Sequence, residues 1–446
     1  MSHDESAKSV LPQEQNESSL KSRVYQGSLW TLIGYGSSQV LRLGGNLLLT
    51  RLLTPEAFGL MALVQTFLSG LQMFSDFGIF PNIVQSPRGE DPKFLNTAWT
   101  IQAIRGVILM IGAFLIAVPA AQIYREPLLM QLLPISGLTA LIGGLASTKL
   151  ATANRRLALQ RLTVIELGTY AISLLVMLTA AWVYRSVWVL VFGSIVGSLL
   201  KTIASHTLLA GERNFFCWDQ ESAQEIKQFG RWIFISTIIA FFALQGDRLI
   251  FGWLINVRFL GIYAIALGLS SIVEQVVEQV NSKVLFPSYA ELLRERPSEL
   301  YRVLRKARFV LLLLSAAFAV FLVLCGQWVI DLLYDDRYLD AGWILQILSV
   351  GYLGRILSIT YGDVLMAKGQ TLIIMRFTIT FTCIQFASMF VGFFFAGSPG
   401  VVVGIAIAEW LTYLVYAAYF ARLSLWQPEL DFPMVLLGGL LTTILC

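Results

Sequence analysis

The chain has 446 residues, of which 56% are hydrophobic and only 13% are charged. A soluble globular protein carries about 25% charged residues, so this composition excludes an ordinary soluble protein and indicates that much of the surface faces lipid. The net charge of +4 is informative only through the positions of the cations. The four cysteines, at positions 217, 325, 383 and 446, lie far apart, so we expect no disulfide framework, metal site or other cofactor.

The chain begins with a polar segment, residues 1–24, which has no apolar core and is predicted to be a disordered cytoplasmic tail. Apolar runs of about the 20 residues that a membrane span needs then follow one another with short connections. The run at 128–149 contains Pro134 and several glycines, which predict a kink. We expect spans at 28–53, 58–80, 97–119, 128–149, 163–184, 187–210, 231–256, 260–287, 307–329, 342–366, 371–396 and 400–421, and a short thirteenth run at 432–446.

The cations between the spans predict the orientation of the chain. If the amino terminus is cytoplasmic, 21 lysines and arginines fall on the cytoplasmic side, in the segments 8–23, 88–93, 149–161, 213–231, 294–308 and 368–376 and at Arg422. The opposite side holds five, namely Arg51, Arg125, Arg185, Arg258 and Arg337. The positive-inside rule therefore predicts a multi-pass membrane protein with its amino terminus in the cytoplasm. The outer connections are all short, so any chemistry must lie within the helical bundle.

An internal repeat relates the two halves of the chain. A shift of 202 positions aligns Trp30 with Trp232, and the turn TPEAFG at 54–59 with NVRFLG at 256–261, without a gap. Six spans separate the copies, so both halves have the same topology across the membrane. We therefore predict an all-α polytopic membrane protein of about 12–13 transmembrane helices, with two pseudo-symmetric six-helix bundles around a central cavity. The expected parts are a bundle at 25–211, a cytoplasmic linker at 212–230, a second bundle at 231–422 and a partial extra helix at 423–446.

The segment LLLTRLLTPEAFGLMALVQTFLSGLQMFSDFGIFPNIVQ, residues 47–85, resembles the amino-terminal signature of bacterial polysaccharide transporters. These are lipid-linked oligosaccharide flippases of the multidrug/oligosaccharidyl-lipid/polysaccharide exporter superfamily. The resemblance implies that the protein flips an undecaprenyl-diphosphate-linked oligosaccharide across the bacterial inner membrane by alternating access. It also implies a role in exopolysaccharide, capsule or O-antigen biosynthesis, with membrane lipids and polysaccharide polymerase or export proteins as partners. Many relatives carry fourteen helices, and the sequence leaves open whether a fourteenth belongs here.

A polar face lies in the first predicted span. Arg42 is near the middle of this span, where a charge costs about 2.5 kcal/mol or more. Gln39 and Asn46 lie three residues before and four residues after it, so the three side chains share one face of the helix. Arg42 can bind a diphosphate bidentately or contact a sugar, or it can form an interhelical ion pair that holds the bundle together. We treat Gln39, Arg42 and Asn46 as candidate substrate-binding residues.

The seventh predicted span carries Asp247 and Arg248. Arg248 aligns with Asn46 in the repeat, so the corresponding face is polar in both halves. Because Asp247 and Arg248 are adjacent, they point in different directions around the helix and are not expected to neutralise each other. We treat Arg248 as a candidate substrate-binding residue and Asp247 as a candidate ion-coupling residue. The alternative is two separate structural pairs.

The eighth and tenth predicted spans supply the remaining candidates. Glu274 and Glu278 lie four residues apart on one helix face, where two carboxylates repel unless one is protonated or a cation lies between them. They are candidates for proton or sodium coupling, and the alternative is pairing with Arg42, Lys283 or Arg355. In the tenth span, Arg355 and Tyr352 suit a sugar or a phosphate. Arg355 can equally form a structural pair within the second bundle.

The sequence favours a transporter over an enzyme. No G-x-x-x-x-G-K-[ST] loop is present, so nucleotide hydrolysis by that route is excluded. A multidrug or cation antiporter of the same superfamily is one alternative, but it would favour acidic cavity residues, and the buried cations argue against it. A membrane glycan polymerase or ligase is less favoured, because such enzymes need an acid or base next to the substrate, usually on a sizeable outer loop. Nothing in the sequence indicates a nucleic-acid partner.

Overall fold

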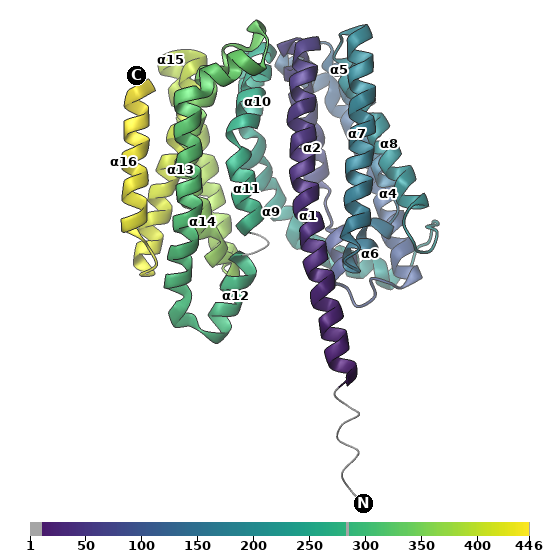
Figure 1. Ribbon diagram of the computed structural model, residues 1–446. Helices are drawn as coiled ribbons and strands as arrows, with labels where there is room; N and C mark the ends of the chain where they lie inside the picture. The colour runs from purple at the N-terminus through teal and green to yellow at the C-terminus, as the bar shows by residue number, and fades with distance from the viewer. Residues whose placement is uncertain (1–10, 282–284, 446) are drawn as a thin grey trace, which may run out of the picture. The chain divides into compact units, whose positions relative to one another are not determined.

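The computed structural model describes residues 11–281 and 285–445, and every regular element within them is a helix (Figure 1). The prediction of an all-α chain is therefore confirmed for these residues. The α-helices are α1 (Leu11–Leu52), α2 (Pro55–Phe74), α3 (Ile79–Gln85), α4 (Pro92–Tyr124), α5 (Leu129–Gly144), α6 (Lys149–Arg155), α7 (Leu159–Tyr184), α8 (Trp188–Thr207), α9 (Gln220–Leu254), α10 (Val257–Ser270), α11 (Ile272–Val280), α12 (Phe286–Glu295), α13 (Leu300–Leu333), α14 (Ala341–Ala367), α15 (Thr371–Arg422) and α16 (Pro428–Leu445).

The helices match the predicted spans. Among the described residues, nine helices are long and apolar enough to cross a membrane, or up to eleven if two bent pairs each count as one span. The helix α1 is not among them, because its polar side chains lower its mean hydropathy. The helix α15 holds two predicted spans, since its backbone is non-helical at Ala396 and Gly397. The predicted thirteenth run is α16.

The two bent pairs are α5–α6 and α10–α11, and α5, α10 and α11 fall largely within predicted spans, whereas α6 lies in the segment predicted to be a connection. The helices α5 and α6 meet at 56°, and α10 and α11 meet at 43°. The first bend follows Gly143 and Gly144, whereas Pro134 lies inside α5. The break exposes backbone carbonyls, and Gln102 of α4 donates hydrogen bonds from Nε2 to three of them, at 3.1–3.2 Å. A broken helix is tolerated in a membrane when neighbouring groups satisfy its backbone in this way.

The helix α1 begins at Leu11, inside the segment that composition predicts to be a disordered tail. Extending an existing helix costs much less than starting one, so the polar residues 11–24 can continue the apolar helix that follows. Residues 1–10 lie outside the described residues. At its other end, α1 stops at Leu52 and α2 starts at Pro55, so the predicted turn at Thr54 is confirmed. Proline suits the first position of a helix.

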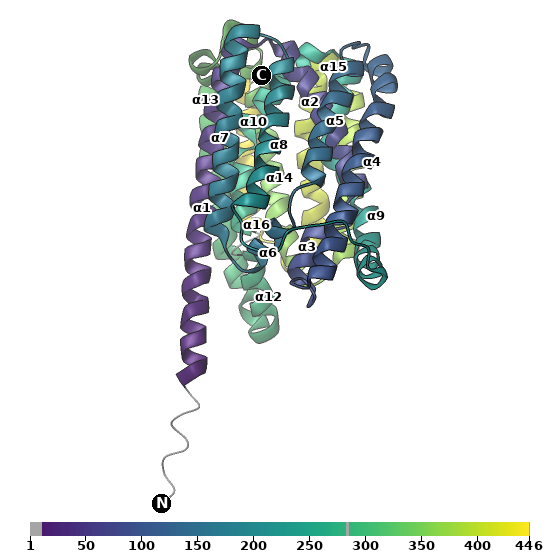
Figure 2. The same cartoon turned by 90° about the vertical axis from the view of Figure 1, so that its right-hand side faces the viewer.

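The chain divides into two compact units. Unit 1 comprises Met1–Leu52, Leu71–Gln122 and Glu126–Phe234, and unit 2 comprises Leu53–Gly70, Ile123–Arg125 and Ile235–Cys446. In unit 1, α1 lies along α7 and α7 lies beside α8 (Figure 2). In unit 2, α14 is the central helix and contacts α10, α11, α12, α13, α15 and α16. This central position explains why α14 is the most buried of the long apolar helices.

Within unit 2, the repeat is visible in the contact between α2 and α10. A Cβ atom at Gly59 would overlap the carbonyl oxygen of Val257, and a Cβ atom at Gly261 would overlap that of Pro55. The two glycines are 202 positions apart, and so are Pro55 and Val257, so the contact is reciprocal under the predicted shift. Only glycine permits this close approach of two backbones, which explains why both turns contain it.

The carboxyl-terminal helix α16 is fixed to unit 2 by a buried polar network. Arg308 of α13 is fully buried and pairs with Asp431 of α16 at 2.8 Å. The other oxygen of Asp431 accepts hydrogen bonds from Tyr361 and Tyr413, at 2.9 and 3.1 Å. Arg308, which the sequence suggested was a loop cation, therefore lies inside the bundle. Breaking such a pair leaves an uncompensated buried charge, so the network holds α16 in place.

Candidate functional site

A cavity of about 230 Å³ lies within unit 2, between α9, α10, α11, α14 and α15. The structure brings six of the nine predicted site residues to this cavity: Asp247, Arg248, Glu274, Glu278, Tyr352 and Arg355. Glu409, from the second half of α15, adds a further carboxylate. The cavity is therefore a concentration of charge within an apolar bundle, which is where functional groups of membrane proteins are expected.

Arg355 is held between two carboxylates. Its Nε donates to Glu274 of α11, and its Nη1 lies 3.2 Å from Glu409. The side chains of the two glutamates are 9% and 11% exposed, so these pairs are shielded from water. The predicted structural pairing of Glu274 with Arg355 is confirmed. The other cation proposed for that pairing within the eighth span, Lys283, lies outside the described residues.

The ion pairs depend on how closely α14 and α15 approach. Gly351 and Gly354 occupy the side of α14 that faces α15. A Cβ atom at Gly354 would lie 3.1 Å from the backbone of Glu409, so the two helices nearly touch there. The adjacent Arg355 is thereby brought level with the Glu409 carboxylate. Small residues at helix contacts allow close approach in membrane bundles.

Asp247 and Arg248 make separate contacts, as their positions around the helix predict. Tyr263 of α10 donates its hydroxyl to Asp247 at 2.6 Å, and the Asp247 residue is 6% exposed. Arg248 donates to Gln245, one turn earlier on α9. No ion pair between Asp247 and Arg248 is present in the described chain. The two side chains therefore offer one carboxylate and one guanidinium to the cavity.

The charge balance of the cavity differs from the sequence expectation. Four acidic residues line it, Asp247, Glu274, Glu278 and Glu409, against the two arginines 248 and 355. The excess of buried cations that the sequence suggested is therefore absent from this cavity. The reason is that Arg42, Arg105 and Lys201 lie in unit 1, and Lys283 lies outside the described residues. A negative cavity is suited to cations or protons more than to a free anion.

The three remaining candidates lie on α1, in unit 1. Arg42 and Asn46 are exposed, while Gln39 is half-buried and donates to the hydroxyl of Tyr35 at 2.9 Å. No carboxylate in the described part of the chain pairs with Arg42, so the structure does not contain the interhelical ion pair considered as the alternative. Tyr170 of α7 is close enough for an electrostatic interaction with Arg42. The guanidinium is therefore available to a ligand.

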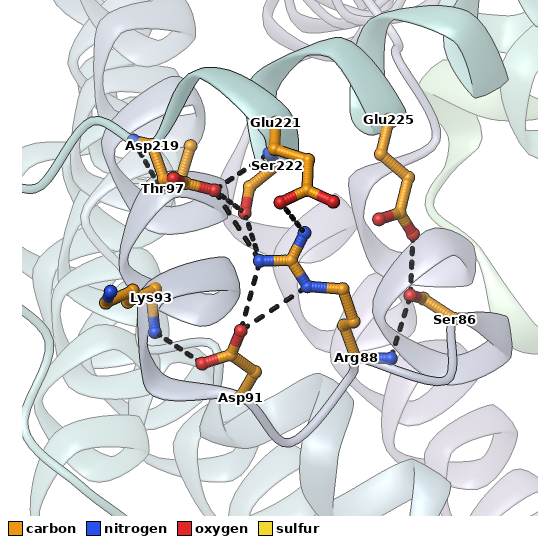
Figure 3. A network of polar contacts seen from close by, with 9 residues as sticks. All are labelled: Ser86, Arg88, Asp91, Lys93, Thr97, Asp219, Glu221, Ser222 and Glu225. Atoms are coloured by element: carbon orange, nitrogen blue, oxygen red, sulfur yellow. Dashed lines mark hydrogen bonds and ion pairs between the residues drawn. The ribbon is translucent and has the colours of Figure 1, made fainter.

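At the end of unit 1 that holds the α3–α4 connection, Arg88 organises a polar network (Figure 3). Its Nη2 lies 3.1 Å from Asp91 and 3.5 Å from Asp219, and its Nη1 lies 3.5 Å from Glu221. Hydrogen bonds from Ser222, followed by the field of Arg88, lower the pKa of Asp219 below its usual value. The network fastens the start of α9 to the α3–α4 connection.

Three residues that line the unit 2 cavity, Tyr263, Gln385 and Glu409, were not among the site residues predicted from the sequence. Glu409 is an acid near the middle of the predicted span 400–421, and the structure gives it Arg355 as a partner. Tyr263 and Gln385 were not considered, although both are polar residues within apolar runs. Gln385 is 5% exposed and its Oε1 accepts no hydrogen bond. A polar side chain in the middle of a span is the signal that could have identified all three.

Comparison with known proteins places the chain in a family. A family described as polysaccharide biosynthesis protein matches residues 48–342. The lipopolysaccharide biosynthesis protein WzxC of Escherichia coli (strain K12) is 24% identical over 440 residues, which is 92% of this chain and 85% of WzxC.

Two solved structures share the fold. The lipid II flippase MurJ, in an inward closed conformation, has a TM-score of 0.69 at 13% identity and covers 94% of this chain and 98% of its own. An inward-facing multidrug resistance transporter of the MATE family, within the MOP superfamily, has a TM-score of 0.65 at 13% identity, with 87% and 94% covered. The predicted fold of the exporter superfamily is thus confirmed. The chain belongs to the polysaccharide biosynthesis protein family and is a multi-pass membrane protein with the exporter fold.

Proposed function

We propose that the protein flips an undecaprenyl-diphosphate-linked oligosaccharide from the cytoplasmic to the outer leaflet of the bacterial inner membrane. The observation that carries this proposal is the family match over residues 48–342, together with an exporter fold that a lipid flippase shares over 94% of the chain. The product would serve exopolysaccharide, capsule or O-antigen biosynthesis, and polymerase or export proteins would receive it.

In this proposal the amino terminus is cytoplasmic, and two bundles, 25–211 and 231–422, alternately open a cavity to each side. Arg42 contacts the diphosphate, because its guanidinium is exposed, unpaired with any described carboxylate and suited to bidentate phosphate binding. Gln39 and Asn46 lie on the same face and contact the adjoining sugar. Gly36 and Gly44 face open space within 4 Å, so bulky groups can approach this part of α1.

The cavity of unit 2 has a different role in the proposal. Arg355 is already neutralised by Glu274 and Glu409, so it positions these carboxylates more than it binds an anion. Glu278 and Asp247 form no ion pair with an arginine side chain in the described chain and supply the negative charge that a proton or a sodium ion would neutralise. We therefore assign Asp247 and Glu278 to ion coupling, with Glu274 contributing only if it exchanges Arg355 for the ion, and Arg248 and Tyr352 to contacts with the polar head of the substrate.

The acidic excess in this cavity also favours a second candidate function. A multidrug or cation antiporter of the same superfamily would use such carboxylates to bind a cationic drug. The two functions differ in whether transport requires Arg42, because an unpaired guanidinium does not attract a cationic drug. The family match favours the flippase.

The experiment that tests the proposal measures where lipid-linked repeats accumulate. In cells that lack the protein, short lipid-linked oligosaccharides should be trapped in the inner leaflet of the inner membrane, and plasmid-borne wild-type protein should restore export. Accumulation of unpolymerised repeats on the outer face would instead indicate a polymerase or ligase. Unchanged glycan export with increased sensitivity to cationic drugs would indicate the antiporter.

A further inference from the structure

A second pocket, of about 160 Å³, lies in unit 1 between the α3–α4 connection, α6 and the segment that leads from α8 to α9. The sequence places all three parts on the side predicted to be cytoplasmic. The charged residues that line this pocket are Glu90, Lys149, Arg156, Glu212 and Arg213. Three cations and two acids give it a net positive charge, in contrast to the acidic cavity of unit 2.

The observation that points to a ligand is the burial of Lys149. This residue is only 7% exposed, yet no carboxylate of the described chain lies within 4 Å of its ammonium group. Its Nζ donates one hydrogen bond, of 3.1 Å, to the carbonyl oxygen of His206. An ammonium group carries three donors, and a buried charge without a counter-charge is costly. An anion in the pocket would supply the missing partner.

The other two cations of the pocket, Arg156 and Arg213, differ in whether an acidic side chain already pairs with them. Arg156 pairs with Glu90 at 2.9 Å, which lowers the pKa of that carboxyl group and keeps it ionised. Arg213 is exposed and forms no ion pair with the described residues. Lys149 and Arg213 therefore carry the charge that is available to an anion. Gly211, with a φ of 143°, leaves room for the stem of Lys149, because a Cβ atom there would lie 3.3 Å from the Lys149 Cγ.

The pocket wall is fixed in advance of binding. Asn214 donates to the Thr148 hydroxyl at 2.8 Å and accepts from the Ser147 hydroxyl at 2.6 Å. Beyond it, the backbone N–H groups of residues 215, 217 and 219 donate to side chains of α4 at 3.0–3.1 Å. The Arg88 network then holds Asp219 and the start of α9 (Figure 3). The segment beside the pocket is thus attached by these five hydrogen bonds and by the Arg88 network.

This attached segment presents exposed aromatic side chains beside the start of a predicted span. Phe215, Phe216 and Trp218 are 58%, 69% and 59% exposed. Their backbone is bonded to Asn96, Thr97 and Thr100, where α4 enters its predicted span at 97–119. Exposed aromatic residues at this level are typical of the interface between lipid headgroups and acyl chains. We therefore expect lipid beside the positively charged pocket.

We propose that this pocket binds the phosphate of an anionic phospholipid of the cytoplasmic leaflet, with Lys149 and Arg213 as its partners and Phe215, Phe216 and Trp218 beside its acyl chains. Basic pockets on the cytoplasmic side of membrane bundles are suited to such headgroups. The site is distinct from the cavity of unit 2 and from the face of Arg42. It does not depend on which substrate the protein transports.

The test is native mass spectrometry of the purified full-length protein, released from detergent in the presence of phosphatidylglycerol or phosphatidylcholine. The wild-type protein should retain one phosphatidylglycerol molecule in preference to phosphatidylcholine. Lys149→Gln and Arg213→Gln should each weaken this binding by about fivefold, since a cation near the membrane surface contributes about 1 kcal/mol to the binding of anionic lipid. Lys227→Gln, an exposed lysine outside the pocket, is the matched control and should bind as the wild type does.

Arg213→Gln keeps the test valid if the buried Lys149→Gln variant fails to fold, because Arg213 is exposed. Equal retention by Arg213→Gln and Lys227→Gln would overturn the proposal, and so would equal binding of the two phospholipids by the wild type. A third arm adds inorganic phosphate in excess. If inorganic phosphate displaces the lipid completely, the pocket is a site for free phosphate and the assignment to a phospholipid is wrong.

Discussion

Arg42 and Arg355 are the same residue type at the middle of a span, but their surroundings are opposite. Arg355 is enclosed by Glu274 and Glu409, whereas no described carboxylate pairs with the exposed Arg42. The comparison shows that depth in the membrane does not by itself indicate a substrate contact. An arginine that is already neutralised contributes to folding and positions its partners, and an arginine without a partner is available to an anion. Mutation of Arg355 should therefore reduce the amount of folded protein, whereas mutation of Arg42 should reduce export.

The largest expected effect is that of Arg355→Ala on stability. The substitution leaves Glu274 and Glu409 as two buried carboxylates without a counter-charge, and breaking a buried pair costs about 3–5 kcal/mol. We expect a large loss of folded protein in the membrane, measured by size-exclusion chromatography of a fluorescent fusion. The triple variant Arg355→Met, Glu274→Gln, Glu409→Gln removes all three charges and should recover much of the folded protein. Wild-type amounts of folded Arg355→Ala would contradict the structural role.

Arg42→Ala should abolish export while the amount of folded protein stays near that of the wild type. Loss of a charge-assisted contact to phosphate, about 2–5 kcal/mol, would reduce export by on the order of 100-fold. Surface polysaccharide, normalised to folded protein, is the measurement. Arg161→Ala, an exposed arginine at the start of α7, is the control and should export normally. Export lost only in proportion to folded protein would remove Arg42 from the proposed site.

Gly261→Ala tests the reciprocal contact between α2 and α10. The added methyl group would overlap the backbone of Pro55, and overpacking of this kind costs about 1–3 kcal/mol. We expect a lower midpoint of thermal unfolding for the detergent-solubilised protein. Gly268→Ala, in open space on the same helix, should leave the midpoint unchanged or raise it slightly, because alanine favours a helix more than glycine does. Equal midpoints for the two variants would show that the close approach is not maintained in solution.

The smallest expected effect is that of removing the ion pair between Glu56 and Arg258, whose side chains lie 3.7 Å apart. These two residues are also related by the shift of 202 positions. Both side chains are about half exposed, and such pairs contribute about 0–1 kcal/mol. Glu56→Gln should therefore change the unfolding midpoint much less than Gly261→Ala does. A larger change than that of Gly261→Ala would mean that charge, more than backbone packing, holds α2 against α10.

Hydropathy and charge were sufficient to predict the long helices, but not the short helices α3, α6 and α12. Long apolar runs give α4, α7, α13 and α14 directly, because each must satisfy its backbone within one segment in lipid. The sequence also located the turn at Thr54 and the repeat, which the Gly59 and Gly261 contacts reflect. The glycines of the run at 128–149 predicted a bend, which the structure has after α5. Its stabilisation was not predictable, because it depends on Gln102 of another helix satisfying the exposed carbonyls.

The sequence left three cations as possible partners of Glu274 and did not indicate which of them pairs with it. Arg355 pairs with residues that lie 81 and 54 positions away, and nothing in local periodicity selects those two acids among several. Similarly, Arg308 is in a run of loop-like cations by position, but the fold buries it against Asp431. Lys149 belongs to a basic segment that charge counting treats as solvated, and only the structure shows that it is buried. Tertiary contacts decide which charges are free.

The most direct test of the central claim is transport by the purified protein reconstituted in liposomes. Undecaprenyl-diphosphate-linked oligosaccharide is placed in one leaflet, and its appearance in the other is measured over time, with a cationic drug assayed in parallel. The wild-type protein should move the lipid-linked oligosaccharide, and Arg42→Ala at the same folded amount should not. Movement of the drug without movement of the lipid, or equal movement of the lipid by both proteins, would contradict the account.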